Sequence, residues 1–577
     1  MNLTVSPRPN GRKYLTIAKS YRDPETKKTK NKQILSLGYL DVLEKQYDDP
    51  IAHFREVARK MTEEENDEKQ VTLTFSMEEE LSNDTNSRKN YGYAAIMKIY
   101  HELDMHEFFA VKARYQKFKF NTNSIMLMLV ISRILSPGSK KKAFEERGRY
   151  FERFDFSLMD VYRALTHFAK IAAQTQKFMH EKIQEKYGRD TSIVYFDATN
   201  FYFEIDEADD LRKRGVSKEK RPNPVVQMGL ALDRDGIPIN YKIFPGNKHD
   251  SETFRDIIGE ICKNYGTGRV IVVGDMGVIT ADNIWYLIGR KPEKPKHGYV
   301  FSFSIRGGTK KFKEYVLSQD GYVNAEGKPA SDADDFKIKV RRDAREIKVS
   351  KVGGGTIKKI VYEKQIVFWG KKYADKAKAE RDVMIQKAML FIKDPSKYKR
   401  HTGHGSAKYI MGIDKETGEV SPEQLLSLDF EAIKEDEKFD GYYAVVTSEH
   451  EMTNNKIIET YRGLWEIEET FRISKGELEA RPVFVSTEDS IEAHFLTCFI
   501  ALTILRILQK KTGRQFSTEA IIKCLNRISC SLEQDNIYLF DYRTEISNAI
   551  GEAINVDFSK KRRYLGEIKK LLGNVKH

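Results

Sequence analysis

The sequence contains few cysteines and no segment typical of secretion or of a membrane span. Its 577 residues include four cysteines, none of them in a C-x-x-C pair: Cys262, Cys498, Cys524 and Cys530. We predict that these thiols are reduced and lie in apolar surroundings, because their spacing fits neither a zinc ribbon nor a disulfide framework. No apolar run approaches the roughly 18 residues of a membrane span, and Met1–Pro9 lacks the apolar core of a signal peptide. We therefore expect a protein of a bacterial cytoplasm, or a similar compartment, with no membrane partner.

The chain is long and positively charged. It has 98 Lys and Arg against 85 Asp and Glu, a net charge of +13 and a pI near 9.1. Its length predicts about three or four domains, and no repeat of solenoid period is present. An excess of positive charge fits a polyanionic partner, most simply nucleic acid. A basic protein without such a partner is the alternative.

One stretch near the end of the chain, Tyr461–Lys475, predicts a single amphipathic helix. Its apolar residues recur at helical spacing: Leu464, Ile467 and Phe471. Tyr461, Glu468 and Lys475 are seven residues apart, which is almost two turns, so they share one stripe of that helix. A carboxylate between a phenol and an ammonium group could bind phosphate and a metal ion. A solvated face with salt bridges is the alternative.

The order of the remaining patterns predicts an α/β protein with several parts. The expected parts are a β-hairpin and helix module (1–70), a helical domain (71–188), a first α/β part (189–305), a β-rich insertion (306–440), a second α/β part (441–512) and a C-terminal helical region (513–577). In the helical domain, short helices and the lysines Lys140–Lys142 fit a helix-turn-helix-like DNA reader or a plain helical bundle equally well.

Three acidic residues form the candidate catalytic group. Asp197 and Asp275 each end a buried-type strand, and Glu468 lies on the later helix. Three carboxylates on rigid elements suit hard divalent cations such as Mg²⁺, which prefer oxygen ligands and also bind phosphate. Thr199 is two residues after Asp197, so it shares that strand face and could orient the carboxylate or contact phosphate.

The motifs around these residues are similar to those of a known family. They are F-D-A-T at 196–199, I-P-I-N-Y-K-I-F-P-G-N at 237–247, V-V-G-D-M-G at 272–277 and Y-R-G-L-W-E-I-E-E-T-F-R-I-S-K-G-E-L at 461–478. With them the chain resembles bacterial insertion-sequence transposases of the DDE class, in the branch with a Tyr-x2-Arg-x3-Glu-x6-Lys signature. The resemblance covers about residues 90–510. It implies an RNase H-like catalytic core interrupted by a β-rich insertion.

The resemblance also implies roles for the candidate residues. Asp197, Asp275 and Glu468 would be the catalytic, metal-binding triad, holding two ions of Mg²⁺ or Mn²⁺. Tyr461 and Lys475 would contact DNA phosphates near the transposon end.

The arginine of the signature is missing, because its position is occupied by Leu464. Arg462 and Arg472 are the candidates to contact DNA in its place. Arg462 points about 200° away from that position around a helix, whereas Arg472 is better placed, four residues after Glu468.

The function implied is that of a transposase that cleaves DNA at terminal inverted repeats and transfers the 3′-OH ends to target DNA. A homodimer on paired ends is expected from the resemblance. Basic segments at Lys213–Arg221 and Arg341–Lys351 are expected to follow the DNA backbone. The alternatives are a metal-dependent nuclease without strand transfer and an inactive DNA-binding protein derived from a transposase.

Overall fold

The structure is a computed structural model that describes the chain except for residues 10, 23–28, 68–77, 79, 81–86, 216–221, 290–294, 352, 395–404 and 412–425. The chain divides into two compact units, Met1–Asn86 and Ser87–His577. Each unit is described by itself.

The N-terminal unit is a three-stranded antiparallel sheet with two helices. Its elements are β1 (Asn2–Pro7), β2 (Lys13–Arg22), β3 (Thr29–Tyr39), α1 (Leu40–Leu43) and α2 (Pro50–Asp67). The predicted hairpin is β2–β3, and β1 pairs with the other edge of β2. Leu15 and Ile17 alternate with polar residues along β2 and are fully buried, as expected for a strand with one face on a core. The Lys-rich tip of this hairpin lies partly outside the described residues.

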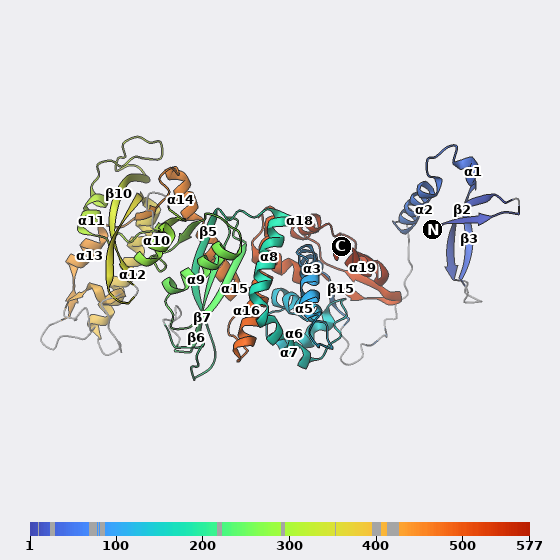
Figure 1. Ribbon diagram of the computed structural model, residues 1–577, viewed down its shortest axis with the longest axis horizontal. Helices are drawn as coiled ribbons and strands as arrows, with labels where there is room; N and C mark the ends of the chain where they lie inside the picture. The colour runs from blue at the N-terminus through green and yellow to red at the C-terminus, as the bar shows by residue number, and fades with distance from the viewer. Residues whose placement is uncertain are drawn as a thin grey trace. The chain divides into compact units, whose positions relative to one another are not determined.

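The C-terminal unit is built on an eight-stranded mixed sheet of order β10-β11-β14-β9-β8-β5-β6-β7 (Figure 1). The strands are β5 (Ile193–Tyr202), β6 (Val225–Leu232), β7 (Pro238–Pro245), β8 (Ile271–Gly274), β9 (Gly298–Ser302), β10 (Phe336–Ser350), β11 (Thr356–Gly370) and β14 (Tyr442–Thr447). Strands β5, β8 and β9 run parallel to one another. The other neighbours are antiparallel.

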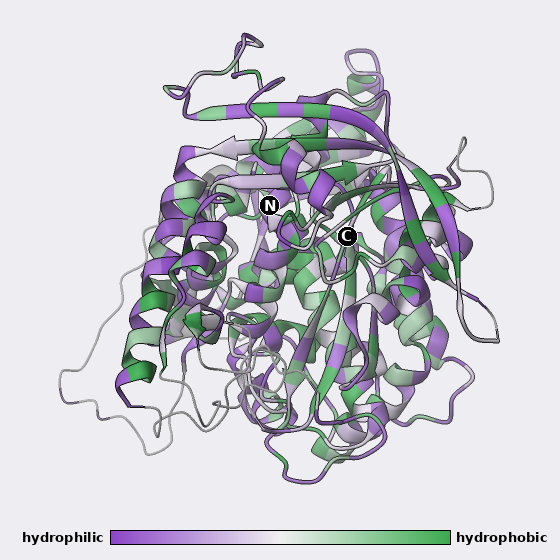
Figure 2. Ribbon diagram, turned by 90° about the vertical axis from the view of Figure 1, so that its left-hand side faces the viewer, coloured by the Kyte–Doolittle hydropathy of each residue, from purple (hydrophilic) through white to green (hydrophobic). Residues whose placement is uncertain are grey.

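The region predicted as a β-rich insertion extends this sheet. Strands β10 and β11 form one long hairpin closed by the glycine turn at 353–355, and β11 pairs with β14. Seen from this end of the unit, polar and apolar residues alternate along the long strands (Figure 2). Helices α11 (Lys310–Leu317), α12 (Lys371–Lys393) and α13 (Phe430–Glu437) belong to the same region. Because β14 returns directly to the core, the insertion is continuous with the catalytic sheet.

Helices cover both faces of the sheet, and the alternation of side chains in β5 decides what each face contacts. Val194 and Phe196 pack with α9 (Asp250–Asn264) and α10 (Ala281–Ile288) in one hydrophobic cluster. Tyr195 and Phe201 point to the other face, in the cluster that includes helices α14 to α16. His249 precedes α9, and its side chain makes no capping hydrogen bond.

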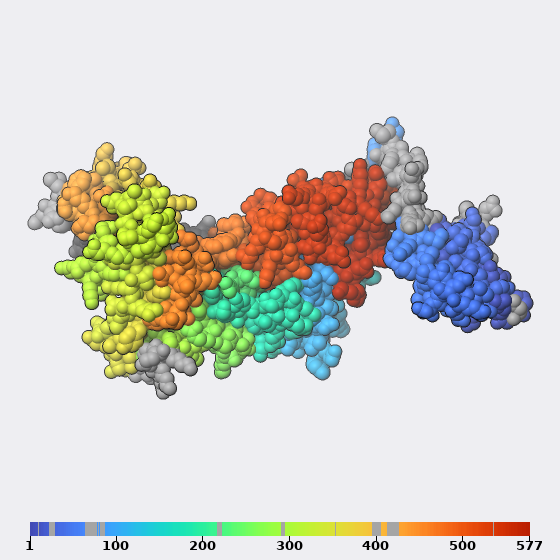
Figure 3. Space-filling model, turned by 90° about the horizontal axis from the view of Figure 1, so that it is seen from above, coloured from blue at the N-terminus to red at the C-terminus, as the bar shows by residue number. Residues whose placement is uncertain are grey.

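The helices before the sheet pack against those after it. They are α3 (Tyr93–Glu102), α4 (Met105–Ala113), α5 (Thr122–Leu135), α6 (Lys140–Glu145), α7 (Leu158–Lys170) and α8 (Ala172–Tyr187), together with α16 (Glu488–Lys511), α17 (Thr518–Arg527), α18 (Glu545–Ile554) and α19 (Leu565–Val575). Helix α16 contacts α3, α5, α7 and α8, and in Figure 3 the red C-terminal atoms lie against the cyan ones. Helix α5 is buried over nearly its whole length, so these helices form a packed bundle. DNA binding by this region stays a prediction.

A small second sheet joins the same two regions. Its order is β17-β16-β15-β4, with β4 (Lys89–Asn90), β15 (Ser529–Leu532), β16 (Ile537–Phe540) and β17 (Arg562–Tyr564). The first described residues of the unit therefore pair with a strand from near its end.

Helix α16 corrects one expectation from the sequence. It holds an 18-residue window of mean hydropathy 1.8, long and apolar enough to cross a membrane by composition alone. Within the protein 94% of that window is buried, so the apolar residues are accounted for by packing between the bundle and the sheet.

Candidate active site

The two candidate aspartates lie on neighbouring parallel strands of the sheet and on the same face. Tyr195 of β5 is paired with Val273 of β8, and Asp197 and Asp275 each follow two residues later. Because side chains alternate, both acids share the face of Tyr195 and Val273, which is the face that carries α14 and α15. Asp275 follows the last residue of β8, as predicted. The prediction that Asp197 ends its strand was wrong, since β5 continues to Tyr202.

The helix predicted from Tyr461 to Lys475 is two helices. They are α14 (Asn454–Arg462) and α15 (Trp465–Lys475), separated by a turn at Gly463 and Leu464. Gly463 lies against β5, where an added Cβ would come within 2.0 Å of the Tyr195 hydroxyl oxygen. The close approach requires glycine, and glycine is a poor helix former. Tyr461 therefore sits on a different helix from Glu468 and Lys475, which still share one stripe of α15.

The phenol of Tyr461 lies near the carboxylates of Asp275 and Glu468. Burial raises the pKa of its phenol to about 12, and the nearby carboxylates of Asp275 and Glu468 add to the rise while a hydrogen bond with Ser302 opposes it. Ser302, the last residue of β9, also donates a hydrogen bond to Asp275 Oδ1 at 3.0 Å. At neutral pH the phenol is protonated and can donate to an anionic oxygen.

Ser302 was missed in the sequence. It lies in none of the sequence motifs that indicated the candidate residues. Its spacing from Val300 could have indicated it. Ser302 is two residues after Val300, so the two share one face of the strand, and Val300 packs in the cluster on the α14 side.

Lys475 joins α15 to the strand that holds Asp197. Its Nζ donates a hydrogen bond to Thr199 Oγ1 at 2.7 Å, and it lies 5.4 Å from the centroid of the Phe201 ring. Thr199 is 3% exposed, so this contact fixes the end of α15 over β5. Glu468, two turns earlier on the same stripe, is exposed at the rim of this face.

The two arginines considered as replacements for Leu464 are both exposed. Arg472 pairs with Glu477 at 2.6 Å and more distantly with Glu469 at 3.8 Å. It is therefore engaged with its own helix and the following turn. Arg462 ends α14 on its solvent side.

Arg506 of α16 holds the opposite side of α15, and nothing in the sequence motifs indicated it. The guanidinium is buried and donates to the Glu466 carbonyl at 2.9 Å and to Thr470 Oγ1 at 2.8 Å. It also pairs with the carboxylates of Glu466 at 3.1 Å and Glu469 at 3.3 Å. These residues flank Glu468, so Arg506 sets the position of the helical turn that carries it.

The donor chemistry of the three acids suits Mg²⁺ or Mn²⁺, since all ligands would be carboxylate oxygens. Their arrangement is open. Asp197 and Asp275 each accept a hydrogen bond from the next backbone N–H, at 2.7 and 2.6 Å. Among the residues that the structure describes, no three His, Cys, Asp or Glu side chains form a group that could hold a metal ion. Asp197 and Asp275 therefore share one face of the sheet, and Glu468 lies on the helix that covers it. In the described residues the three carboxylates are not close enough together to form a metal site.

Comparison with known proteins defines the class. Residues 188–504, more than half of the chain, match the family model of the transposase DDE domain, so the chain belongs to the DDE transposases. The segment contains Asp197, Asp275 and Glu468. Residues 3–72 match the model of the IS1634 family transposase, N-terminal domain. The two matches together identify an insertion-sequence DDE transposase.

Similarity to individual proteins is weak. No curated protein matches the chain. One similar solved structure is the cryo-EM structure of a piggyBac transposase synaptic complex with hairpin DNA, with 7% sequence identity over 84% of this chain and 85% of that one. Its TM-score of 0.37 is too low to support an argument about fold or mechanism.

Proposed function

We propose that this transposase cleaves DNA at the terminal inverted repeats of its element and transfers the 3′-OH ends to target DNA. The observation that carries the proposal is that Asp197, Asp275 and the helix of Glu468 lie on one face of the sheet, within the segment that matches the DDE domain. Bacterial cytoplasm is the compartment in which this activity would meet its DNA.

We assign the strands β7-β6-β5-β8-β9 to an RNase H-like core. They are contiguous in the sheet, with two antiparallel pairings followed by two parallel ones. Helices α9 and α10 provide the crossovers between the parallel strands. Strand β5 is at the centre of the five, which keeps Asp197 on a rigid element.

Asp197, Asp275 and Glu468 would hold divalent ions in this site. Two bound Mg²⁺ or Mn²⁺ ions supply activation of the attacking oxygen and stabilisation of the leaving oxygen of a phosphodiester. The side chains around them position the substrate. Lys475 supplies a positive charge for a DNA phosphate, and the protonated phenol of Tyr461 supplies a hydrogen bond.

The remaining DNA contacts that we propose are spread over the chain. Arg462 and Arg472 are exposed and would contact the DNA backbone near the cleaved bond. Thr199 is buried and would contribute to DNA binding by accepting the hydrogen bond that positions Lys475. Most of the segment Arg341–Lys351 lies in β10, at the edge of the sheet, and Lys351 follows the end of that strand. The other basic segment, Lys213–Arg221, is only partly within the described residues. Because transposition acts on the two ends of the element together, we propose that the protein binds them as a homodimer.

The test uses purified protein and DNA that carries the element's ends. Asp197→Ala, Asp275→Ala and Glu468→Gln are expected to abolish Mg²⁺-dependent cleavage while binding to the ends persists. Glu459→Gln is the matched control, because Glu459 is an exposed surface residue of α14 and its loss should leave cleavage unchanged. Normal cleavage by Glu468→Gln would refute the assignment of the third acid.

A second experiment distinguishes the transposase from a nuclease without strand transfer and from an inactive DNA-binding protein. Pre-cleaved ends with a free 3′-OH are mixed with target DNA and Mg²⁺, and joined product is measured. Cleavage without joining would indicate a nuclease, and end binding that needs no metal and gives no product would indicate an inactive DNA-binding protein.

A further inference from the structure

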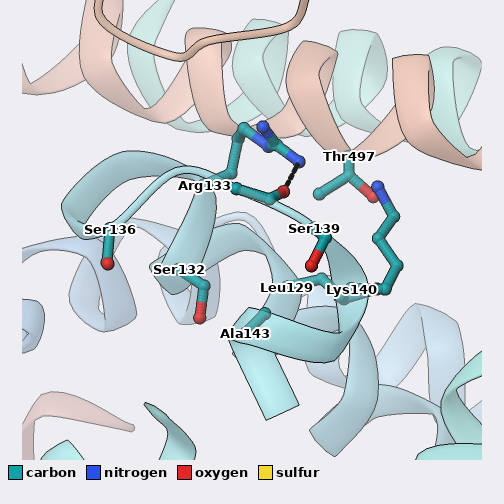
Figure 4. A pocket seen from close by; sticks show the side chains of 9 residues that line it. Leu129, Ser132, Arg133, Ser136, Ser139, Lys140, Ala143 and Thr497 are labelled. Carbon is teal, nitrogen blue, oxygen red and sulfur yellow. Dashed lines mark hydrogen bonds between the residues drawn. The ribbon is translucent and has the colours of Figure 1, made fainter. Parts of the chain in front are cut away.

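A small pocket in the helical bundle contains two buried cations. It lies at the turn between α5 and α6, against α16, and is lined by Arg133, Ser139, Lys140 and Thr497 (Figure 4). An adjoining space of about 20 Å³ opens toward the surface between Tyr162 and Phe484, which are 43% and 63% exposed. That volume admits one or two atoms the size of a water oxygen.

Neither cation pairs with a carboxylate among the residues that the structure describes. Arg133 donates to the carbonyl oxygens of Leu478 and Glu479, both at 3.2 Å, and of Gly138 at 2.9 Å, and its Nε has no hydrogen-bond partner within the described ranges. Lys140 Nζ is 2.9 Å from His494 Nδ1. Both side chains are 5% exposed. No ion pair joins either of them to an acidic group in the described part of the chain.

Burying two positive charges without an anion costs free energy, because the charges lose their hydration and carbonyl dipoles compensate only in part. Neighbouring lysines show how selective the burial is: Lys141 and Lys142 are exposed, and only Lys140 of the three is turned into the bundle. A pocket with an unpaired donor, two cations and an opening to solvent has the features of an oxyanion site.

We propose that this pocket is a phosphate-binding site, which takes one anionic oxygen of a phosphate group between Arg133 and Lys140. The phosphate is either a free ion or a backbone phosphate of DNA. The second source rests on the proposed function, whereas the first is independent of it.

The protonation state of Lys140 gives the site a pH dependence. Burial, and then the nearby Arg133, lowers the pKa of Lys140 to about 7. The other titratable groups facing it are His494, whose pKa burial lowers well below its usual value, and Cys498, whose pKa burial raises. Neither changes charge between pH 6 and pH 8.5. Anion binding should therefore be strong at pH 6 and weaker at pH 8.5.

The first experiment measures thermal unfolding of the full chain at pH 6 in low concentrations of sodium phosphate or sodium acetate at equal ionic strength. Phosphate is expected to raise Tm in a saturable way. Lys140→Met should lose this response, and Lys141→Met, which replaces the exposed neighbour, should keep it. An equal response in the wild type and in Lys140→Met, or an equal rise in acetate, would overturn the site.

Two further measurements cover the remaining outcomes. Sulfate keeps its charge across this pH range, so any change in its binding reports the protein. The rise in Tm of the wild type with sulfate should shrink from pH 6 to pH 8.5 as Lys140 loses its proton. An undiminished rise contradicts the proposal, even if Lys140→Met does not fold. If DNA supplies the phosphate, Lys140→Met should weaken binding of a short duplex about tenfold, the effect of one charge-assisted contact. Unchanged duplex binding with a retained phosphate response in the wild type assigns the site to free phosphate and leaves the proposed function intact.

Discussion

Replacing Arg506 by methionine tests whether α16 holds α15, and with it Glu468, in position. The side chain is 4% exposed. The substitution removes its hydrogen bonds to the Glu466 carbonyl, Thr470 and Gln509 and its ion pairs to Glu466 and Glu469. Glu466, itself 5% exposed, loses one of its two guanidinium partners, since Arg514 remains at 2.6 Å. Removing one partner of a buried pair costs about 3–5 kcal/mol, so we expect a loss near the lower end of that range.

Arg472→Met is the matched control on the other side of the same helix. Arg472 is 53% exposed and its partner Glu477 is 12% exposed, so this pair is only partly buried, and losing it should cost less stability than losing the buried Arg506. Unfolding in urea, followed by far-UV circular dichroism, gives both values. Equal destabilisation by the two substitutions, or a loss below about 1 kcal/mol for Arg506→Met, would refute the reasoning.

A double-mutant cycle with Glu466→Gln apportions the effect. We expect a coupling free energy above about 1 kcal/mol between the two positions, because they are in direct contact. Additive losses would mean that the destabilisation arises from packing of the arginine stem alone.

Three further outcomes are expected. Ser302→Ala should lower the rate of cleavage, because Asp275 loses its side-chain donor, while Ser302→Thr retains a hydroxyl and most of the rate; equal rates for both would show that the hydrogen bond is not needed. Thr199→Val should destabilise the protein by about 1.5–3 kcal/mol in chemical unfolding, since it leaves the Lys475 ammonium without its hydroxyl acceptor, and no loss in the Lys475→Met background is expected. Burial lowers the pKa of His180 to about 4, below the unfolded value near 6.5. The neutral form is required in the fold, so stability should fall by about 3 kcal/mol as pH decreases from about 6.5 to 4, and His180→Gln should flatten the pH dependence of unfolding in this range.

The sequence was sufficient for those features that depend on local pattern. Strand β8 is a short apolar run that ends at an acid, and the position of Asp275 follows from it. The family motifs located all three acids within one DDE domain. The hairpin and helix of the N-terminal unit also follow from alternation and helical period.

The features that were missed depend on contacts between distant segments. The break between α14 and α15 arises where Gly463 meets Tyr195, and the periodicity of the helix gives no sign of that contact. The buried role of Arg506 depends on α16 packing beside α15. The sequences of β10 and β11 resemble an independent insertion, because their polar pattern does not reveal that β14 pairs with β11.

The small sheet of β4, β15, β16 and β17 has a consequence for synthesis of the protein. Asn90 and Ser529 are register partners, and β17 at Arg562–Tyr564 completes the same sheet. The ribosome must therefore synthesise the whole stretch between β4 and β15 before the earliest strand of this unit can pair. The small sheet closes only after β15, β16 and β17 have emerged, so a product terminated before Ser529 lacks the strands that join the two ends of the unit.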